Sequence, residues 1–145
     1  MRKTTITELS HFTTVLQNYL ADYHPQLLLN EDFIKIRSEE AAQMYEEARR
    51  DGESTHVALE LANEVLYSGL KFSKYKTVRS ILESDFLTVP EDKQAAFALK
   101  MLNRCKTVFD RYQIADDFET SSEYSLLCWE LLGEIQNYID EYGVQ

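Results

Sequence analysis

The sequence predicts an all-α fold: a single compact domain of about six helices over residues 1–145, packed orthogonally or as a bundle. Apolar residues recur at spacings of three and four along almost the whole chain, which is the period of an amphipathic helix. The 145 residues contain four Gly and two Pro, too few for the many tight turns of a β-sandwich. Apolar residues make up 44% of the chain, and no linker is rich in Pro, Gly or Ser. One packed domain is therefore expected.

The first predicted helix spans about residues 8–23. It ends at His24-Pro25, because the residue before a proline is pushed out of helical space. The second helix is predicted to begin after Asn30, whose side chain suits an N-cap, and to run to about Arg50. Gly52 lies just beyond that end, where a glycine favours helix termination.

The third predicted helix begins near Ser54 or Thr55 and ends around Gly69. Ser73 can cap a short fourth helix, which carries apolar residues as far as Phe86. Pro90 then occupies a position typical of the first residue of the next helix.

The fifth predicted helix runs from Pro90 to about Asp110. The sixth is expected to open with a capping box at Thr120-Ser121-Ser122-Glu123 and to continue to Tyr142. Gly143 then ends it.

The sequence contains no motif typical of a nucleotide-binding, hydrolase or metal site. Glu53 and His56 match one Glu-x-x-His unit, but helical di-iron sites need two such units and two further glutamates. Neither Cys105 nor Cys128 has a histidine near it in sequence. We therefore predict no catalytic residue, no cofactor and no metal site, and the sequence favours a protein that is not an enzyme.

The chain also lacks the features of an exported or membrane protein. No stretch approaches the roughly 20 apolar residues that a membrane span requires. The first eight residues have two positive charges but no apolar run behind them, unlike a signal peptide. Cys105 and Cys128 fit reduced core thiols. The predicted location is the cytoplasm.

Negative charge is concentrated at the C-terminal end. The net charge is −10, and residues 112–145 contain eight acids but no lysine or arginine. Four glutamates of the last predicted helix fall on a line about 40° wide at 100° per residue. We call these the acidic stripe: Glu123, Glu130, Glu134 and Glu141. They are either a solvated surface or a binding surface for a basic protein.

Two apolar residues of the same helix, Leu126 and Trp129, fall outside its main apolar arc. They indicate either a contact patch or a helix that is buried on most of its circumference. We expect burial.

A second segment has the opposite charge. The basic-aromatic segment consists of Lys71, Phe72, Lys74, Tyr75, Lys76 and Arg79. Basic residues beside rings can hold phosphates and stack bases, but the acidic remainder of the chain argues against direct nucleic-acid binding. We expect the rings to pack in the core and the lysines to meet the acidic stripe of the same molecule or of a second copy in a homodimer.

Several strings resemble a family known as domain of unknown function 1896, small acidic helical proteins from anaerobic gut and oral bacteria. They are residues 24–28 (HPQLL), 32–34 (DFI), 62–75 (ANEVLYSGLKFSKY), 116–118 (DDF) and 141–143 (EYG). The resemblance spans nearly the whole chain. It implies an all-helical cytoplasmic protein, often encoded near conjugative elements, and it implies no activity, ligand or catalytic residue.

The leading functional hypothesis is a non-enzymatic protein–protein interaction module that uses its acidic C-terminal helix against an unknown basic protein. The alternative is a DNA-mimic inhibitor of a DNA-binding protein, encoded by a mobile element. Such a mimic needs carboxylates spaced like phosphates on one convex face. A metal-dependent enzyme is the third hypothesis.

Overall fold

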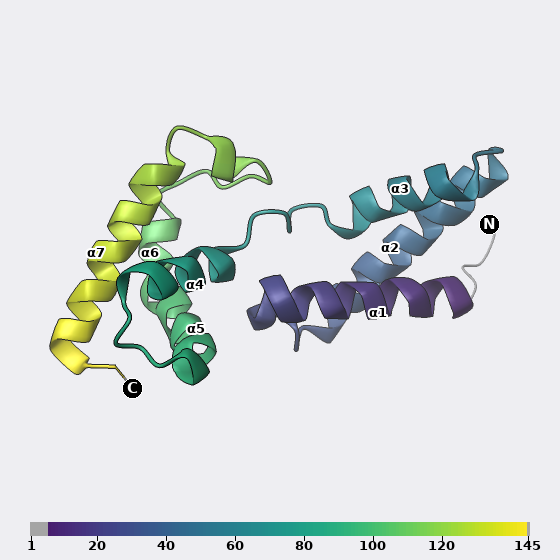
Figure 1. The fold of residues 1–145 in the computed structure, drawn as a ribbon. Helices are drawn as coiled ribbons and strands as arrows, with labels where there is room; N and C mark the ends of the chain where they lie inside the picture. Colours follow the sequence, from purple (N-terminus) through teal and green to yellow (C-terminus); the bar gives the residue numbers. More distant parts are fainter. Residues whose placement is uncertain (1–5, 145) are drawn as a thin grey trace. The chain divides into compact units, whose positions relative to one another are not determined.

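The described part of this computed structural model, residues 6–144, contains seven α-helices, three short 3-10 helices and no β-strand (Figure 1). The predicted all-α class is confirmed. The first five residues, on which part of the signal-peptide prediction rests, lie outside the described residues. The contacts divide the chain into two compact units, Met1–Leu70 and Lys71–Gln145, and each is described by itself. The single domain expected over residues 1–145 stays a prediction.

The first unit contains α1 (Ile6–Tyr23), the 3-10 helix η1 (Pro25–Leu27), α2 (Glu31–Arg50) and α3 (Thr55–Leu66). Helix α2 packs against both α1 and α3. The predicted caps are present: Asn30 accepts a hydrogen bond from the Phe33 N–H at 3.1 Å, and Ser54 accepts one from the Val57 N–H at 3.2 Å. Gly52 follows α2 with φ 94°, a conformation that favours glycine.

The core of the first unit joins large side chains of α1 to alanines and larger apolar side chains of α2 and α3. Its buried members are Phe12, Leu16, Leu20, Ile34, Ala41, Ala42, Ala62, Leu66 and Leu70. Two polar side chains close this core at its end. The Tyr19 hydroxyl donates to the Leu70 carbonyl oxygen at 2.9 Å, and Nε2 of the buried His24 lies 2.6 Å from the same oxygen. The chain after α3 is therefore tied back to α1.

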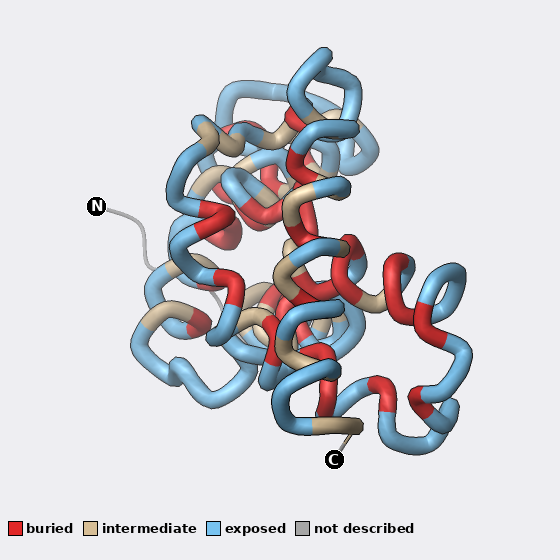
Figure 2. Tube along the Cα trace, turned by 90° about the vertical axis from the view of Figure 1, so that its left-hand side faces the viewer, coloured by how far each residue is buried: buried red, intermediate tan, exposed pale blue. Residues whose placement is uncertain are grey.

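The second unit contains α4 (Lys74–Asp85), η2 (Glu91–Lys93), α5 (Gln94–Arg104), α6 (Lys106–Phe109), η3 (Phe118–Thr120) and α7 (Tyr124–Tyr142). Ser73 caps α4 as predicted, accepting from the Lys76 N–H at 2.9 Å. Gly143 ends α7 with φ 78°. Figure 2 shows buried stretches alternating with exposed ones along the chain. The buried residues of α7 are Leu127, Leu131 and Ile135.

Two predicted boundaries in this unit were wrong. The fifth helix is not continuous, because the fully buried Cys105 leaves helical geometry with φ −94° and ψ 11°. The expected capping box is also absent. Thr120 instead ends η3, and its hydroxyl donates to the Asp117 carbonyl oxygen at 2.8 Å. Helix α7 therefore begins at Tyr124, and Glu123 precedes it without a side-chain cap.

Candidate functional site

The two central glutamates of the acidic stripe are paired within the second unit. Glu134 accepts from Arg104 Nε at 3.0 Å. Glu130 accepts from Arg111 Nη1 at 2.5 Å, and it also accepts a hydrogen bond from the Tyr112 hydroxyl. The middle of the stripe is thus partly neutralised by two arginines that follow each other closely in sequence.

The contact between Tyr112 and Glu130 shifts the pKa values of both side chains. The hydrogen bond from Tyr112 is the main cause that lowers the pKa of the Glu130 carboxyl, and Arg111 lowers it further. Burial, together with the adjacent Glu130 carboxylate, raises the pKa of Tyr112 to about 12. Glu130 is therefore held as a carboxylate and Tyr112 as a neutral phenol.

The two outer members of the stripe differ from the central pair. Glu123 and Glu141 are exposed, and neither has an ion pair among residues 6–144. They lie about 27 Å apart at 1.5 Å per helical residue. The stripe therefore offers unpaired charge at its two ends rather than along its length.

The expected burial of Leu126 and Trp129 was wrong. Leu126 is 54% exposed and Trp129 is 71% exposed. Helix α7 packs against α4, α6 and η3, and its fully buried residues all lie on the opposite side. Helix α7 is therefore buried on one side only, and the contact patch at these two positions stays a hypothesis.

Gly133 lies on the same side of α7, and nothing in the described part of the second unit requires a glycine there. A Cβ built at Gly133 would have no atom within 4 Å, and Gly133 is not among the glycines with positive φ. Glycine in a helix interior costs about 1 kcal/mol relative to alanine. Sequence reasoning overlooked this residue, although a glycine outside the apolar arc of a long helix was a readable signal.

We call Leu126, Trp129, Gly133 and Asn137 the outer face of α7. At 100° per residue they occupy an arc of about 80°, and the acidic stripe lies between this arc and the buried face. All four residues are exposed. Leu126 and Trp129 are three residues apart, so their side chains are neighbours on the helix surface.

The rings of the basic-aromatic segment lie in the core of the second unit. Phe72 and Tyr75 are buried, and Phe72 meets Phe118 edge to face at 5.4 Å between ring centroids. Arg79 donates to the Tyr75 hydroxyl at 2.9 Å and lies 3.6 Å from Glu83. Lys74 Nζ lies 5.4 Å from the centre of the Phe109 ring. Neither buried ring is presented to stack on a base.

The remaining members of that segment are Lys71 and Lys76. Lys71 and Lys76 are exposed. The Lys71 backbone N–H donates to Asp116 at 3.2 Å, which ties the start of the unit to the loop before η3. Sequence reasoning matched the acidic stripe to these lysines, whereas the partners of Glu134 and Glu130 are Arg104 and Arg111.

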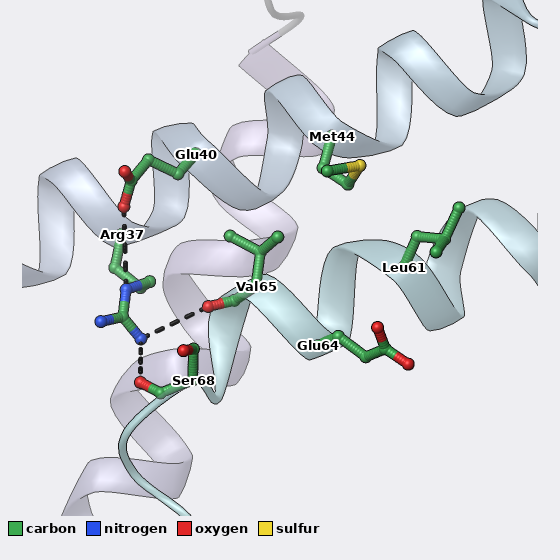
Figure 3. Close-up of a pocket in the computed structure, with 7 residues that line it drawn as sticks. All are labelled: Arg37, Glu40, Met44, Leu61, Glu64, Val65 and Ser68. Atoms are coloured by element: carbon green, nitrogen blue, oxygen red, sulfur yellow. Dashed lines mark hydrogen bonds and ion pairs between the residues drawn. The ribbon is translucent and has the colours of Figure 1, made fainter.

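The first unit has a pocket of about 410 Å³ between α2 and α3 (Figure 3). Its lining residues are Arg37, Glu40, Met44, Leu61, Glu64, Val65 and Ser68. Arg37 Nη1 donates to the carbonyl oxygens of Val65, Leu66 and Ser68 at 3.3, 3.1 and 2.6 Å. The guanidinium thus satisfies the open carbonyls at the C-terminus of α3, so the main polar group of this pocket serves the fold.

Nucleophiles and metal ligands are not assembled in the described structure. Burial is the main cause that raises the pKa of Cys105 to about 12, and it also raises the pKa of Cys128, so both thiols resist ionisation. His56 lies 2.6 Å from Glu60 on an exposed surface. Among residues 6–144, no three His, Cys, Asp or Glu side chains converge as metal ligands would. Within the same range, no helix is both long and apolar enough to cross a membrane.

Taken together, the geometry defines a small all-helical protein whose most distinctive surface is the outer face of an acidic helix. Residues 4–144 match the domain of unknown function DUF1896, and the chain belongs to this family. The structure is similar to a crystal structure of protein PG0816 from Porphyromonas gingivalis, with a TM-score of 0.91 and 39% sequence identity. That match covers 96% of this chain and 95% of the other. No curated protein matches the sequence.

Proposed function

We propose that the protein is a non-enzymatic interaction module that binds a basic protein through α7. The observation that carries this proposal is the outer face, where Trp129 and Leu126 are exposed next to each other. Single exposed apolar residues are common on protein surfaces. An adjacent pair that includes tryptophan is more informative, because tryptophan is enriched among the residues that dominate protein–protein binding energy.

The charge of α7 favours a basic partner. Residues 112–145 contain eight acids and no lysine or arginine. Among residues 6–144, Glu130 and Glu134 are the members of the stripe that are paired with arginines. A field of one sign steers an oppositely charged partner and raises the association rate. Apolar contact then supplies most of the affinity, while the surrounding charge supplies selectivity.

The test uses the chain's only tryptophan as a reporter. Trp129 is the single tryptophan, so its emission reports on the outer face without a label. We would titrate the protein with an 18-residue Lys/Leu peptide that lacks tryptophan. The proposal predicts a blue shift of emission and an affinity that falls as salt is raised. No binding, or binding that is insensitive to salt, would overturn it.

Two double variants with the same change of charge test whether the acidic stripe is the binding surface. Glu123→Gln with Glu141→Gln should weaken peptide binding severalfold, because both carboxylates are exposed and have no ion pair within residues 6–144. The control is Glu91→Gln with Asp92→Asn, which changes the charge equally at η2. Equal weakening by both pairs would assign the effect to net charge alone. Reversing Glu130 and Glu134 is a poorer test, because lysines there would face Arg111 and Arg104.

The DNA-mimic alternative has less support. A mimic needs a regular array of unpaired carboxylates, whereas the two central glutamates of the stripe are paired with arginines. It predicts that double-stranded DNA competes with the protein for a DNA-binding partner. A partner that is captured equally well with and without excess DNA would exclude it. The metal-dependent enzyme has no supporting cluster in the described residues.

A further inference from the structure

We infer that the docking element of the partner is a basic amphipathic α-helix that crosses α7 at Gly133 and places its apolar residues on Trp129 and Leu126. This inference rests on the proposed function. It adds the secondary structure of the partner and the point of closest approach, which charge alone does not give.

The crossing point follows from Gly133. The space where its Cβ would lie is open to 4 Å, and its backbone does not need the left-handed region. The helix therefore accepts a poor helix former without any benefit inside the chain. A missing side chain on an exposed helix surface allows a second backbone to approach more closely than the usual 8–10 Å between helix axes. A partner backbone that comes closest to α7 at residue 133 explains why a glycine is present there.

The surroundings of Gly133 fit a helix better than a loop or a flat surface. Trp129 lies four residues before it and Leu126 seven, which places the apolar contacts about one and two turns along α7. The outer face extends for about 16 Å, or three turns. An amphipathic helix presents apolar residues at the same intervals of three, four and seven. Two such surfaces can interlock side chains around the glycine.

The charges select a basic helix over a second copy of the chain. The outer face borders the acidic stripe, and Asp140 lies in its arc one turn beyond Asn137. A second copy that docked through its own α7 would bring the same acids and no lysine or arginine from residues 112–145. Like charges placed together oppose association. A helix with lysines or arginines on both sides of its apolar stripe would instead face Glu123, Glu141 and Asp140.

The experiment compares two Lys/Leu peptides of identical composition and length. In one, the leucines form a single face of a helix; in the other, they are spread around it. We expect the amphipathic peptide to bind at least ten times more tightly and to shift Trp129 emission to the blue. Equal affinity for both peptides, with sensitivity to Glu123→Gln and Glu141→Gln retained, would overturn the inference and leave the proposed function intact. Absence of binding by either peptide would overturn both.

Gly133→Ala provides the decisive variant. The methyl group should raise the unfolding midpoint by a few degrees, because alanine favours the helix. The same methyl group should weaken binding of the amphipathic peptide about tenfold, because it holds the two helices apart. Ser125→Ala, at an exposed position of α7 outside the outer face, should leave the affinity unchanged. A stabilised Gly133→Ala protein with unchanged affinity would overturn the crossing point.

Self-association is measured in parallel. Sedimentation of the protein alone over a range of concentrations should show no dimer that Trp129→Gln dissociates. A dimer of that kind, with Trp129 emission shifting to the blue as concentration rises, would assign the outer face to a second copy and overturn the basic helix.

Discussion

The two units use their arginines differently. In the first, Arg37 donates to three main-chain carbonyls at the end of α3. In the second, Arg104 and Arg111 bind carboxylates of α7. The last carbonyls of a helix have no partner within that helix, whereas an exposed carboxylate is well solvated without an arginine. The first arrangement therefore completes the fold, and the second mainly adjusts the charge of a surface.

Arg37→Ala is expected to have the largest effect on stability. It leaves three carbonyl oxygens at the end of α3 without their donor, and a hydrogen bond from a charged group contributes about 1.5–3 kcal/mol. We expect a loss of about 2 kcal/mol in urea unfolding followed by circular dichroism. Lys35→Ala, at an exposed position of the same helix, is the control. A loss for Arg37→Ala no greater than that of the control would contradict the structural role.

A pair of glycine substitutions should have effects of opposite sign in the two units. Gly52→Ala places a side chain at φ 94°, which costs about 1–2 kcal/mol. Gly133→Ala gains about 1 kcal/mol from helix propensity, since its Cβ meets no atom. Thermal unfolding of both variants measures the difference. Destabilisation by Gly133→Ala would show that the fold itself requires this glycine.

Arg111→Ala should change stability by less than about 1 kcal/mol, because pairs this exposed contribute little. It should nevertheless strengthen binding of the basic peptide severalfold, because it frees the Glu130 carboxylate. Trp129 fluorescence measures the affinity, and Lys106→Ala, which also removes one positive charge, is the control. Equal gains for the two variants would mean that net charge, and not the stripe, controls binding.

The pH dependence is the smallest of the expected effects. Glu130 has a lowered pKa in the folded state, so its contribution is present above the ordinary carboxyl value and is lost as the pH falls through the folded value. Tyr112 has a pKa raised from 10.0 to about 12, so its contribution is present below pH 10 and is lost as the pH rises toward 12. Tyr112→Phe should reduce the alkaline part, to which Cys105 also contributes because its pKa is raised to about 12, and should flatten the acidic part. An unchanged alkaline limb in urea unfolding would contradict the assignment to Tyr112.

Local signals predicted most of the fold. Asn30, Ser54 and Ser73 cap their helices as expected, because an N-cap depends on residues three positions apart. The break at Cys105 and the missing capping box depend on the packing of the second unit, which spacing does not reveal. The four acidic-stripe residues were found by periodicity, but their pairing with Arg104 and Arg111 joins residues 30 and 19 positions apart. Periodicity placed Trp129 outside the apolar arc of the last helix, but the prediction that it is buried was wrong. Its exposure depends on contacts between residues far apart in sequence, which spacing does not reveal.

The contact between His24 and the Leu70 carbonyl oxygen determines the tautomer of the neutral His24 ring. A carbonyl oxygen only accepts hydrogen bonds, so the Nε2 atom of His24, 2.6 Å from the Leu70 oxygen, must carry a hydrogen. In the neutral ring the lone pair then lies on Nδ1. While this bond holds, Nε2 of His24 serves neither as a general base nor as a metal ligand. Nitrogen-15 chemical shifts of the imidazole should therefore show a hydrogen on Nε2 of this buried side chain.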